Sequence, residues 1–121
     1  MFDHVALNVS NAKKSREFYE HALKPMGYGV AATFEGWTGF GKGEKPGFWI
    51  VAREPISKGA HIALAAPDRK AVDAFYNAAM AAGGKDNGKP GVRKDYSPNY
   101  YAAFVFDPDG NNIEVVCHTP A

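Results

Sequence analysis

Two histidines and a glutamate in this sequence have the chemistry and the placement of a divalent metal site. His4 begins the tetrapeptide His-Val-Ala-Leu, and His61 begins the similar tetrapeptide His-Ile-Ala-Leu. Glu114 follows an isoleucine in an apolar stretch, where a carboxylate is costly unless a cation, a metal or a hydrogen-bond donor lies beside it. Two imidazoles and one carboxylate with open positions suit Fe(II), Mn(II), Zn(II) or Ni(II) without distinguishing among them. Such a metal would polarise a substrate oxygen or activate water or O₂.

The two histidines correspond because the chain contains an internal repeat. Residues 4–23 align with residues 61–80 without a gap, and seven of the twenty pairs are identical. The identical pairs are His4/His61, Ala6/Ala63, Leu7/Leu64, Lys13/Lys70, Phe18/Phe75, Tyr19/Tyr76 and Ala22/Ala79. Equivalent positions of two associated copies meet at the seam between them, which favours a pair of ligands. Either histidine alone could instead be structural, and both could be kept from common ancestry without a function.

Each copy is expected to begin with a strand and a helix. Apolar segments at residues 5–9 and 62–66 predict the strands, and Ser10-Asn11 and Pro67-Asp68 are helix N-terminal cap signals. An i, i+3, i+4, i+7, i+8 stripe predicts the buried face of each helix. Its members are Ser15, Phe18, Tyr19, Ala22 and Leu23 in the first copy, and Val72, Phe75, Tyr76, Ala79 and Met80 in the second.

Three further strands are expected after each helix. They are predicted near Gly29–Phe34, Trp37–Gly41 and Gly47–Arg53, and near Gly91–Lys94, Tyr101–Phe106 and Asn112–His118. The length of 121 residues fits one domain. We therefore predict an α+β domain over residues 1–121, built from two tandem βαβββ modules at about 1–56 and 57–121.

Strand alternation places the candidate ligands on one kind of face. Successive side chains point to opposite sides of a strand, so a helix that covers Leu7 and Leu64 leaves His4 and His61 on the other side. Ile113 and Val115 would likewise pack under a helix and send Glu114 to the inner face. The small alanines that follow each histidine would leave room for a cavity there. This arrangement predicts a metal site on the faces opposite the helices.

The residues described so far resemble the vicinal oxygen chelate superfamily, which includes glyoxalase I, fosfomycin-resistance and bleomycin-resistance proteins and extradiol dioxygenases. The similarity covers essentially the whole chain, and the stretch from Asp107 through Gly110 to Ile113-Glu114 is its most specific part. The resemblance implies paired βαβββ modules that form a half-barrel cavity, with His4, His61 and Glu114 as metal ligands. Glyoxalase I has a fourth ligand where this chain has Trp49, and an indole cannot bind a metal. Glyoxalase I activity is therefore not expected.

Two functions from different classes remain open at this stage. The first is a metal-dependent enzyme of lyase, transferase or dioxygenase type, acting on a small substrate with adjacent oxygens, for which no catalytic base can be named. The second is a metal-free protein that sequesters a small molecule in an aromatic cavity. The substrate-binding candidates under either function are Trp37, Phe40, Trp49, Arg93, Tyr96 and Tyr101. Arg93, Tyr96, Tyr100 and Tyr101 lie in or near a loop that could cover a ligand.

Composition excludes several other classes of protein. The formal net charge of +1, with Lys and Arg scattered along the chain, gives no reason to expect a nucleic acid or an anionic membrane as partner. The single Cys117 and the absence of an apolar N-terminal run or an 18-residue apolar stretch lead us to expect a cytoplasmic protein without a membrane span. Family habit implies a homodimer. Whether the modules pair within one chain or swap between chains is open.

Overall fold

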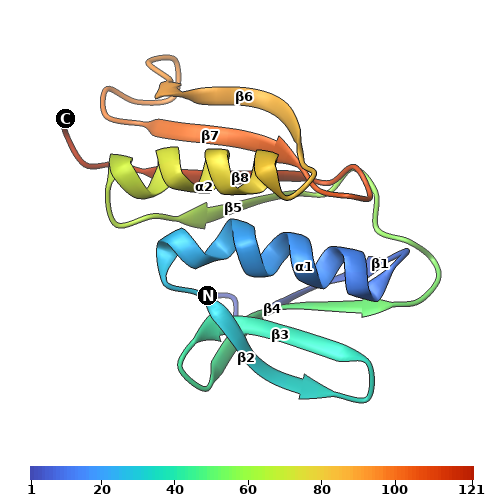
Figure 1. The fold of residues 1–121 in the computed structure, drawn as a ribbon. Coiled ribbons are helices and arrows are strands. Elements are labelled where there is room, and N and C mark those ends of the chain that lie inside the picture. The colour runs from blue at the N-terminus through green and yellow to red at the C-terminus, as the bar shows by residue number, and fades with distance from the viewer.

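The computed structural model describes residues 1–121 and contains two successive modules, each a strand, a helix and three strands (Figure 1). The first module consists of β1 (Val5–Val9), α1 (Ala12–Leu23), a 3₁₀ turn (Lys24–Met26), β2 (Gly29–Phe34), β3 (Trp37–Lys42) and β4 (Lys45–Ala52). The second consists of β5 (His61–Ala65), α2 (Arg69–Ala81), β6 (Lys85–Val92), β7 (Tyr101–Phe106) and β8 (Asn112–Cys117). The α+β fold of two βαβββ modules predicted from the sequence is confirmed.

Each module has its own four-stranded mixed sheet. The strand orders are β1-β4-β3-β2 and β5-β8-β7-β6, and the first pair of each sheet is parallel. Ala6 is opposite Trp49 in the first sheet, and Ala63 is opposite Glu114 in the second. Trp49 and Glu114 therefore occupy equivalent positions. Because the two sheets share no hydrogen-bonded strand pair, equivalent residues of the repeat lie on separate sheets.

The helices begin where the cap signals predict. The Asn11 side chain accepts a hydrogen bond from the Lys14 amide, and Asp68 accepts one from the Ala71 amide. All five positions of the α1 stripe are buried as predicted. In α2, Val72, Phe75 and Ala79 are buried as predicted, but Tyr76 and Met80 are only partly buried. Ala71, which the stripe did not include, is buried as well. Neither helix has the length and apolarity that a membrane crossing requires.

One hydrophobic core joins the two modules. It is a cluster of 19 buried residues that come from both helices and both sheets. The Tyr19 ring of α1 packs 4.8 Å from the Phe48 ring, measured between centroids. A Cβ atom added to Gly84, in the second module, would lie only 2.9 Å from the Phe18 ring of the first. The two helices, one from each module, accordingly lie side by side where the modules meet (Figure 1).

The turn between β7 and β8 ties three segments of the chain together. The carboxylate of Asp107, which is 5% exposed, accepts hydrogen bonds from the Tyr19 hydroxyl (2.5 Å) and from the Asn111 amide (2.8 Å). Asn111 in turn accepts a bond from the Ala60 amide (3.0 Å) and donates one to the Ser57 carbonyl (2.9 Å). We call this network of Tyr19, Asp107 and Asn111 the Asp107 clamp. It fixes α1 and the linker between the modules to the second sheet.

The clamp predicts how stability depends on alkaline pH. Burial, and then the charge of Asp107, raises the pKa of the Tyr19 hydroxyl well above its ordinary value of about 10. The folded state therefore keeps this proton at pH values where the unfolded chain loses it, so stability is lost as pH rises above 10. The Tyr19 contribution is up to about 1.4 kcal/mol per pH unit. Urea unfolding of wild type and Tyr19→Phe at pH 8 to 11 should show a shallower decline in the variant. Parallel declines would contradict this role of Tyr19.

The strand predicted at Gly91–Lys94 is wrong, because β6 runs from Lys85 to Val92. Its sequence is polar and contains Pro90, so it lacks the apolar alternation that marks a strand. As the edge strand of its sheet it tolerates a proline and irregular pairing. Its register with β7 shifts on both sides of Gly88, which has a φ of 155°.

Candidate functional site

His61 and Glu114 form a close pair on the face of the second sheet that α2 does not cover. Ile113 and Val115 pack into the core beneath α2, so Glu114 between them points to the opposite face. The Nε2 atom of His61 lies 2.8 Å from the Oε1 atom of Glu114. The Glu114 side chain is 2% exposed, whereas the His61 side chain is 55% exposed. A buried carboxylate thus has an accessible imidazole beside it.

Tyr100 contacts the second oxygen of the same carboxylate. Its hydroxyl donates a hydrogen bond to Oε2 of Glu114. Burial, followed by this hydrogen bond, raises the pKa of Tyr100 to about 12, so the phenol is a proton donor at neutral pH. Sequence reasoning placed Tyr100 only in a covering loop. Its contact depends on the loop conformation between β6 and β7, which no local pattern encodes.

Asn112 supplies another oxygen on this face. It is opposite His61 in the register of β5 and β8, two residues before Glu114, and therefore on the same side of the sheet. Its Oδ1 atom is buried and has no hydrogen-bond partner. An acceptor without a donor is unusual in a folded protein. Sequence reasoning missed this residue, although its spacing from Glu114 was a usable signal.

His4 lies in the other module, and the chain does not bring it to the pair. Its Nδ1 atom is 2.6 Å from Oδ1 of Asp3, and its side chain is 56% exposed. In a single chain, residues 1–121, no three side chains of His, Cys, Asp or Glu lie close enough together to hold one metal ion. Of the three ligands predicted from the sequence, His61 and Glu114 are therefore adjacent, and His4 is exposed immediately before the first strand of the other sheet.

His4 borders an aromatic cup on the open face of the first sheet. The cup has a volume of about 630 Å³ and is lined by Asp3, His4, Ala6, Phe34, Trp37, Pro46 and Trp49. The Trp37 and Trp49 rings meet edge to face, with centroids 6.4 Å apart. The Arg53 guanidinium lies 4.8 Å from the Trp37 ring, and its Nε donates to the Asn8 side chain. We call this hollow the tryptophan cup; its walls suit a flat apolar group.

Gly39 makes room for one wall of the tryptophan cup. A Cβ atom at this position would lie 2.9 Å from two atoms of the Trp49 ring and 2.8 Å from Cβ of Pro46. Gly39→Ala is therefore expected to displace Trp49, at a cost of about 1–3 kcal/mol in stability. Tryptophan fluorescence and urea unfolding measure both effects. Gly47→Ala is the matched control, since a Cβ there meets nothing within 4 Å. An unchanged emission spectrum in Gly39→Ala would contradict the prediction.

Two of the predicted substrate-binding residues lie on the wrong face. Phe40 is 1% exposed and packs near Tyr19 in the core. Tyr101 is on the α2 side of its sheet, where its hydroxyl donates to Asp73 of α2 (2.6 Å). Residues three apart on a strand point to opposite faces. Because Trp37 and Phe104 lie on the open faces of their sheets, Phe40 and Tyr101 must point to the other side. Phe40 and Tyr101 therefore do not share a face with the other predicted substrate-binding residues.

Each of the other two candidates is separated from the His61–Glu114 pair by one aromatic side chain, Tyr100 or Phe104. The ring of Tyr96 is 65% exposed and lies 4.9 Å from the Tyr100 ring. The Arg93 guanidinium lies 5.4 Å from the Phe104 ring, whose own centroid is 6.3 Å from that of His61. These side chains form a second group of aromatic and basic residues, on the second sheet.

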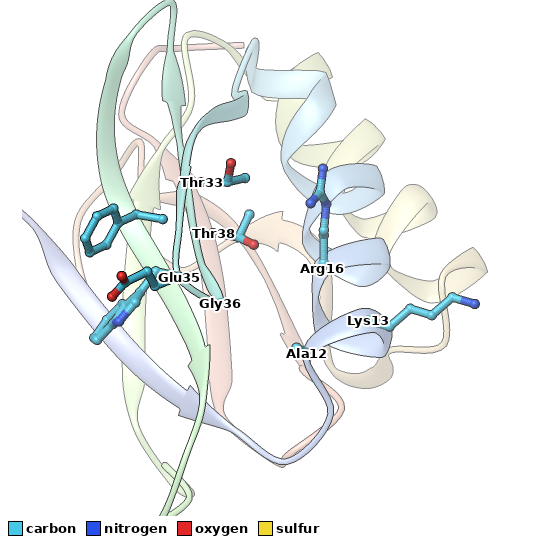
Figure 2. Close-up of a pocket in the computed structure, with 9 residues that line it drawn as sticks. Ala12, Lys13, Arg16, Thr33, Glu35, Gly36 and Thr38 are labelled. Atoms are coloured by element: carbon cyan, nitrogen blue, oxygen red, sulfur yellow. The ribbon is translucent and has the colours of Figure 1, made fainter.

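A further hollow of about 510 Å³ lies between the start of α1 and the β2–β3 hairpin (Figure 2). Thr33 and Thr38 of the hairpin face Arg16 of α1, while the Lys13 side chain extends away from the hairpin (Figure 2). Arg16 is already paired with Glu20, with Nε and Oε1 2.7 Å apart. The basic groups of this hollow are thus engaged or directed elsewhere, and it lacks converging catalytic groups.

Comparisons with known proteins agree with this architecture. A glyoxalase/bleomycin resistance protein from Albidiferax ferrireducens T118 is 29% identical and superposes with a TM-score of 0.84, over 99% of both chains. A glyoxalase/bleomycin resistance protein/dioxygenase family enzyme from Burkholderia phytofirmans PsJN is 16% identical, with a TM-score of 0.74 over 97% of this chain and 98% of that one. Glyoxalase I from Zea mays is 20% identical, with a TM-score of 0.69 over 99% of this chain and 45% of that one.

These structures share the fold, and the family is shown by the sequence itself. No curated protein matches the chain. The profile of the Glyoxalase/Bleomycin resistance protein/Dioxygenase superfamily matches residues 1–115, a span that includes the first module, the second module up to the middle of β8, and the His61–Glu114 pair. This protein belongs to the Glyoxalase/Bleomycin resistance protein/Dioxygenase superfamily.

Proposed function

We propose that this protein is a metal-dependent enzyme, of lyase, transferase or dioxygenase type, that acts on a small substrate with adjacent oxygen atoms. The observation that carries the proposal is the 2.8 Å separation between Nε2 of His61 and Oε1 of Glu114. Nitrogen and oxygen ligands bind divalent zinc at about 2.0–2.2 Å, so both atoms are within reach of one ion. Glu114 has no lysine or arginine within 4.0 Å, and the unpaired Oδ1 of Asn112 lies on the same face. These residues fit a divalent cation such as Fe, Mn, Zn or Ni.

The third ligand in this proposal is His4 from a second copy of the chain. His4 is exposed on a separate sheet, so it can approach the His61–Glu114 pair only across an interface. The open faces of the two sheets, which bear the tryptophan cup and the pair, would meet there in a homodimer. A symmetric dimer has two such contacts and would contain two equivalent sites.

The roles of the protein groups follow from their positions. His61, Glu114 and His4 would hold the metal, which when bound polarises the substrate oxygens. Tyr100 orients the Glu114 carboxylate through its hydrogen bond. The tryptophan cup would bind the apolar part of the substrate and exclude water from it. Trp49 occupies the position in the first sheet that is equivalent to Glu114 in the second. Because an indole does not bind a metal, the proposed site has three protein ligands, and the proposed activity is not that of glyoxalase I.

Elemental analysis tests the metal directly. Protein purified without a metal-affinity step should contain a divalent ion, or take up Mn, Fe, Ni or Zn in equilibrium dialysis. His61→Ala should lose this ion, whereas His21→Ala should keep it, because His21 is exposed on α1 and contacts the Glu17 carbonyl. A wild-type protein that neither contains nor takes up any of these metals would sink the proposal.

Mixing two inactive variants tests the shared site. His4→Ala and His61→Ala should each bind metal weakly as homodimers. After unfolding and refolding together, half of the dimers are mixed, and each mixed dimer has one intact site. About a quarter of the wild-type sites should then return. No recovery, with heterodimers demonstrated by mass, would show that the site is not built across the interface.

A second candidate function is metal-free sequestration of a small aromatic molecule. It is favoured by one observation, which is that both oxygens of Glu114 already have hydrogen-bond partners in His61 and Tyr100. The tryptophan cup would then be the main binding surface. Ligand binding followed by tryptophan fluorescence should survive both EDTA treatment and His61→Ala under this function, and should be lost in at least one of them under the first.

A further inference from the structure

Arg93 is a partly buried cation without an acidic partner. It lies in the loop that follows β6, and none of the ion pairs in the structure includes it. Its Nη1 donates to the Gly91 carbonyl (2.9 Å), and its Nη2 donates to the Lys89 carbonyl (2.7 Å). The guanidinium also lies over the Phe104 ring, 5.4 Å from its centroid. Two carbonyls and an aromatic face thus fix a charged group that has no counter-ion.

The guanidinium lies on the same open face as the His61–Glu114 pair. Phe104 is opposite Glu114 in the register of β7 and β8, and opposite Gly88 in the register of β6 and β7. A Cβ atom at Gly88 would lie 2.8 Å from the Phe104 ring and 3.2 Å from Nη2 of Arg93. Gly91 also leaves room for the guanidinium, because a Cβ atom there would lie 3.1 Å from Nη1 of Arg93. Arg93 is therefore separated from Glu114 by a single side chain.

The remaining donors of Arg93 are suited to a carboxylate. A guanidinium carries five N–H donors and stays charged at any pH a protein experiences. Two donors are used by the carbonyls, which leaves three for a ligand. Its planar fork matches the two oxygens of a carboxylate. Glu114 is not that carboxylate, because its oxygens are bound by His61 and Tyr100.

We propose that Arg93 forms an anion subsite and that the substrate of this protein is a small organic carboxylate. The inference of an anion subsite follows from the position of Arg93 alone. The inference that the bound anion is the substrate rests on the proposed function. The carboxylate would bind the free edge of the guanidinium while neighbouring oxygens of the same molecule reach the His61–Glu114 pair.

Nuclear magnetic resonance of the Arg93 Nε–H group tests the subsite. The probes are mandelate, which is a carboxylate with an adjacent hydroxyl, and mandelamide, its neutral counterpart. Mandelate should shift the Nε–H signal, which is identified by its absence in Arg93→Lys, and mandelamide should not. Arg93→Gln should weaken mandelate binding roughly tenfold or more. Arg93→Lys should restore part of the affinity, and Lys94→Gln, a neighbouring exposed cation, should bind like wild type.

Repeating the titration after metal chelation separates this inference from the proposed function. A mandelate-specific shift of Arg93 in chelated protein supports the subsite even if the protein never binds a metal. Equal shifts with mandelate and mandelamide, or no shift with mandelate in either the untreated or the chelated protein, would overturn the subsite. The metal proposal is judged separately, by the metal content of the untreated protein. Unaltered mandelate affinity in Arg93→Gln would also overturn it.

Discussion

Asp107→Ala is expected to lower the free energy of unfolding by about 3–5 kcal/mol, the largest effect we predict for a single polar side chain. The variant removes an acceptor that is 5% exposed and serves the Tyr19 hydroxyl and the amides of Asp109 and Asn111. Each of these donors is left without its partner, and the buried Tyr19 hydroxyl cannot reach water. Such a loss is a large share of the 5–15 kcal/mol that usually stabilises a domain. Urea unfolding at one fixed protein concentration measures it.

The neighbouring carboxylate provides the control for this prediction. Asp109 accepts two hydrogen bonds from Ser10, at an exposed position where water can replace it. Asp109→Ala should therefore cost about 1 kcal/mol. Equal losses in the two variants would mean that the Asp107 clamp contributes no more than an ordinary surface turn.

Glu114→Leu is expected to separate metal binding from stability. Loss of a metal ligand should reduce metal affinity by more than the roughly 10–100-fold that loss of a supporting partner costs. Stability should stay within about 1 kcal/mol of wild type or rise, because the leucine removes a polar group whose burial costs free energy and fills its place with apolar atoms. His61 keeps access to water in this variant, since its side chain is 55% exposed. Metal content and urea unfolding are the two measurements.

Val115→Ala should show the opposite behaviour. Val115 follows Glu114 on β8 but faces the core under α2, with no exposed surface. Its truncation should cost about 2 kcal/mol in stability while metal content stays unchanged. If Glu114→Leu were instead destabilised as strongly as Val115→Ala, Glu114 would be a structural residue of the sheet.

Local periodicity explains why much of the fold was predictable from the sequence. The repeat defined the modules, the helical stripe predicted the buried residues of α1, and alternation placed Glu114 and His61 on the open face. Alternation would also have excluded Phe40 and Tyr101 had it been applied strictly. The bounds of β6 were not predicted, because its pairing with β7 shifts register around Gly88. The amino-acid composition of a segment does not indicate where such shifts occur.

The relative placement of the modules could not be predicted in the same way. The repeat suggests that His4 meets His61 at a seam, but the chain places them on separate sheets. That outcome depends on how the two helices fit together, for example on Phe18 lying close to Gly84. Such contacts join residues distant in sequence, and they depend on the shapes of side chains that no short pattern records. The hydrogen bond from Tyr100 to Glu114 was not predictable for the same reason, because it depends on the conformation of the loop between β6 and β7.

The shared core also limits how small a folded unit of this kind can be. Tyr19 and Leu23 from the first module and Val72 and Phe75 from the second belong to one buried cluster. A chain ending after the first module would expose its half of that cluster and would have to find a second copy to cover it. Joining two modules by the short linker around Ser57 replaces that encounter with an effective concentration of millimolar order, as short flexible linkers provide. The covalent link therefore makes burial of the core independent of dilution and leaves the open sheet faces free for association.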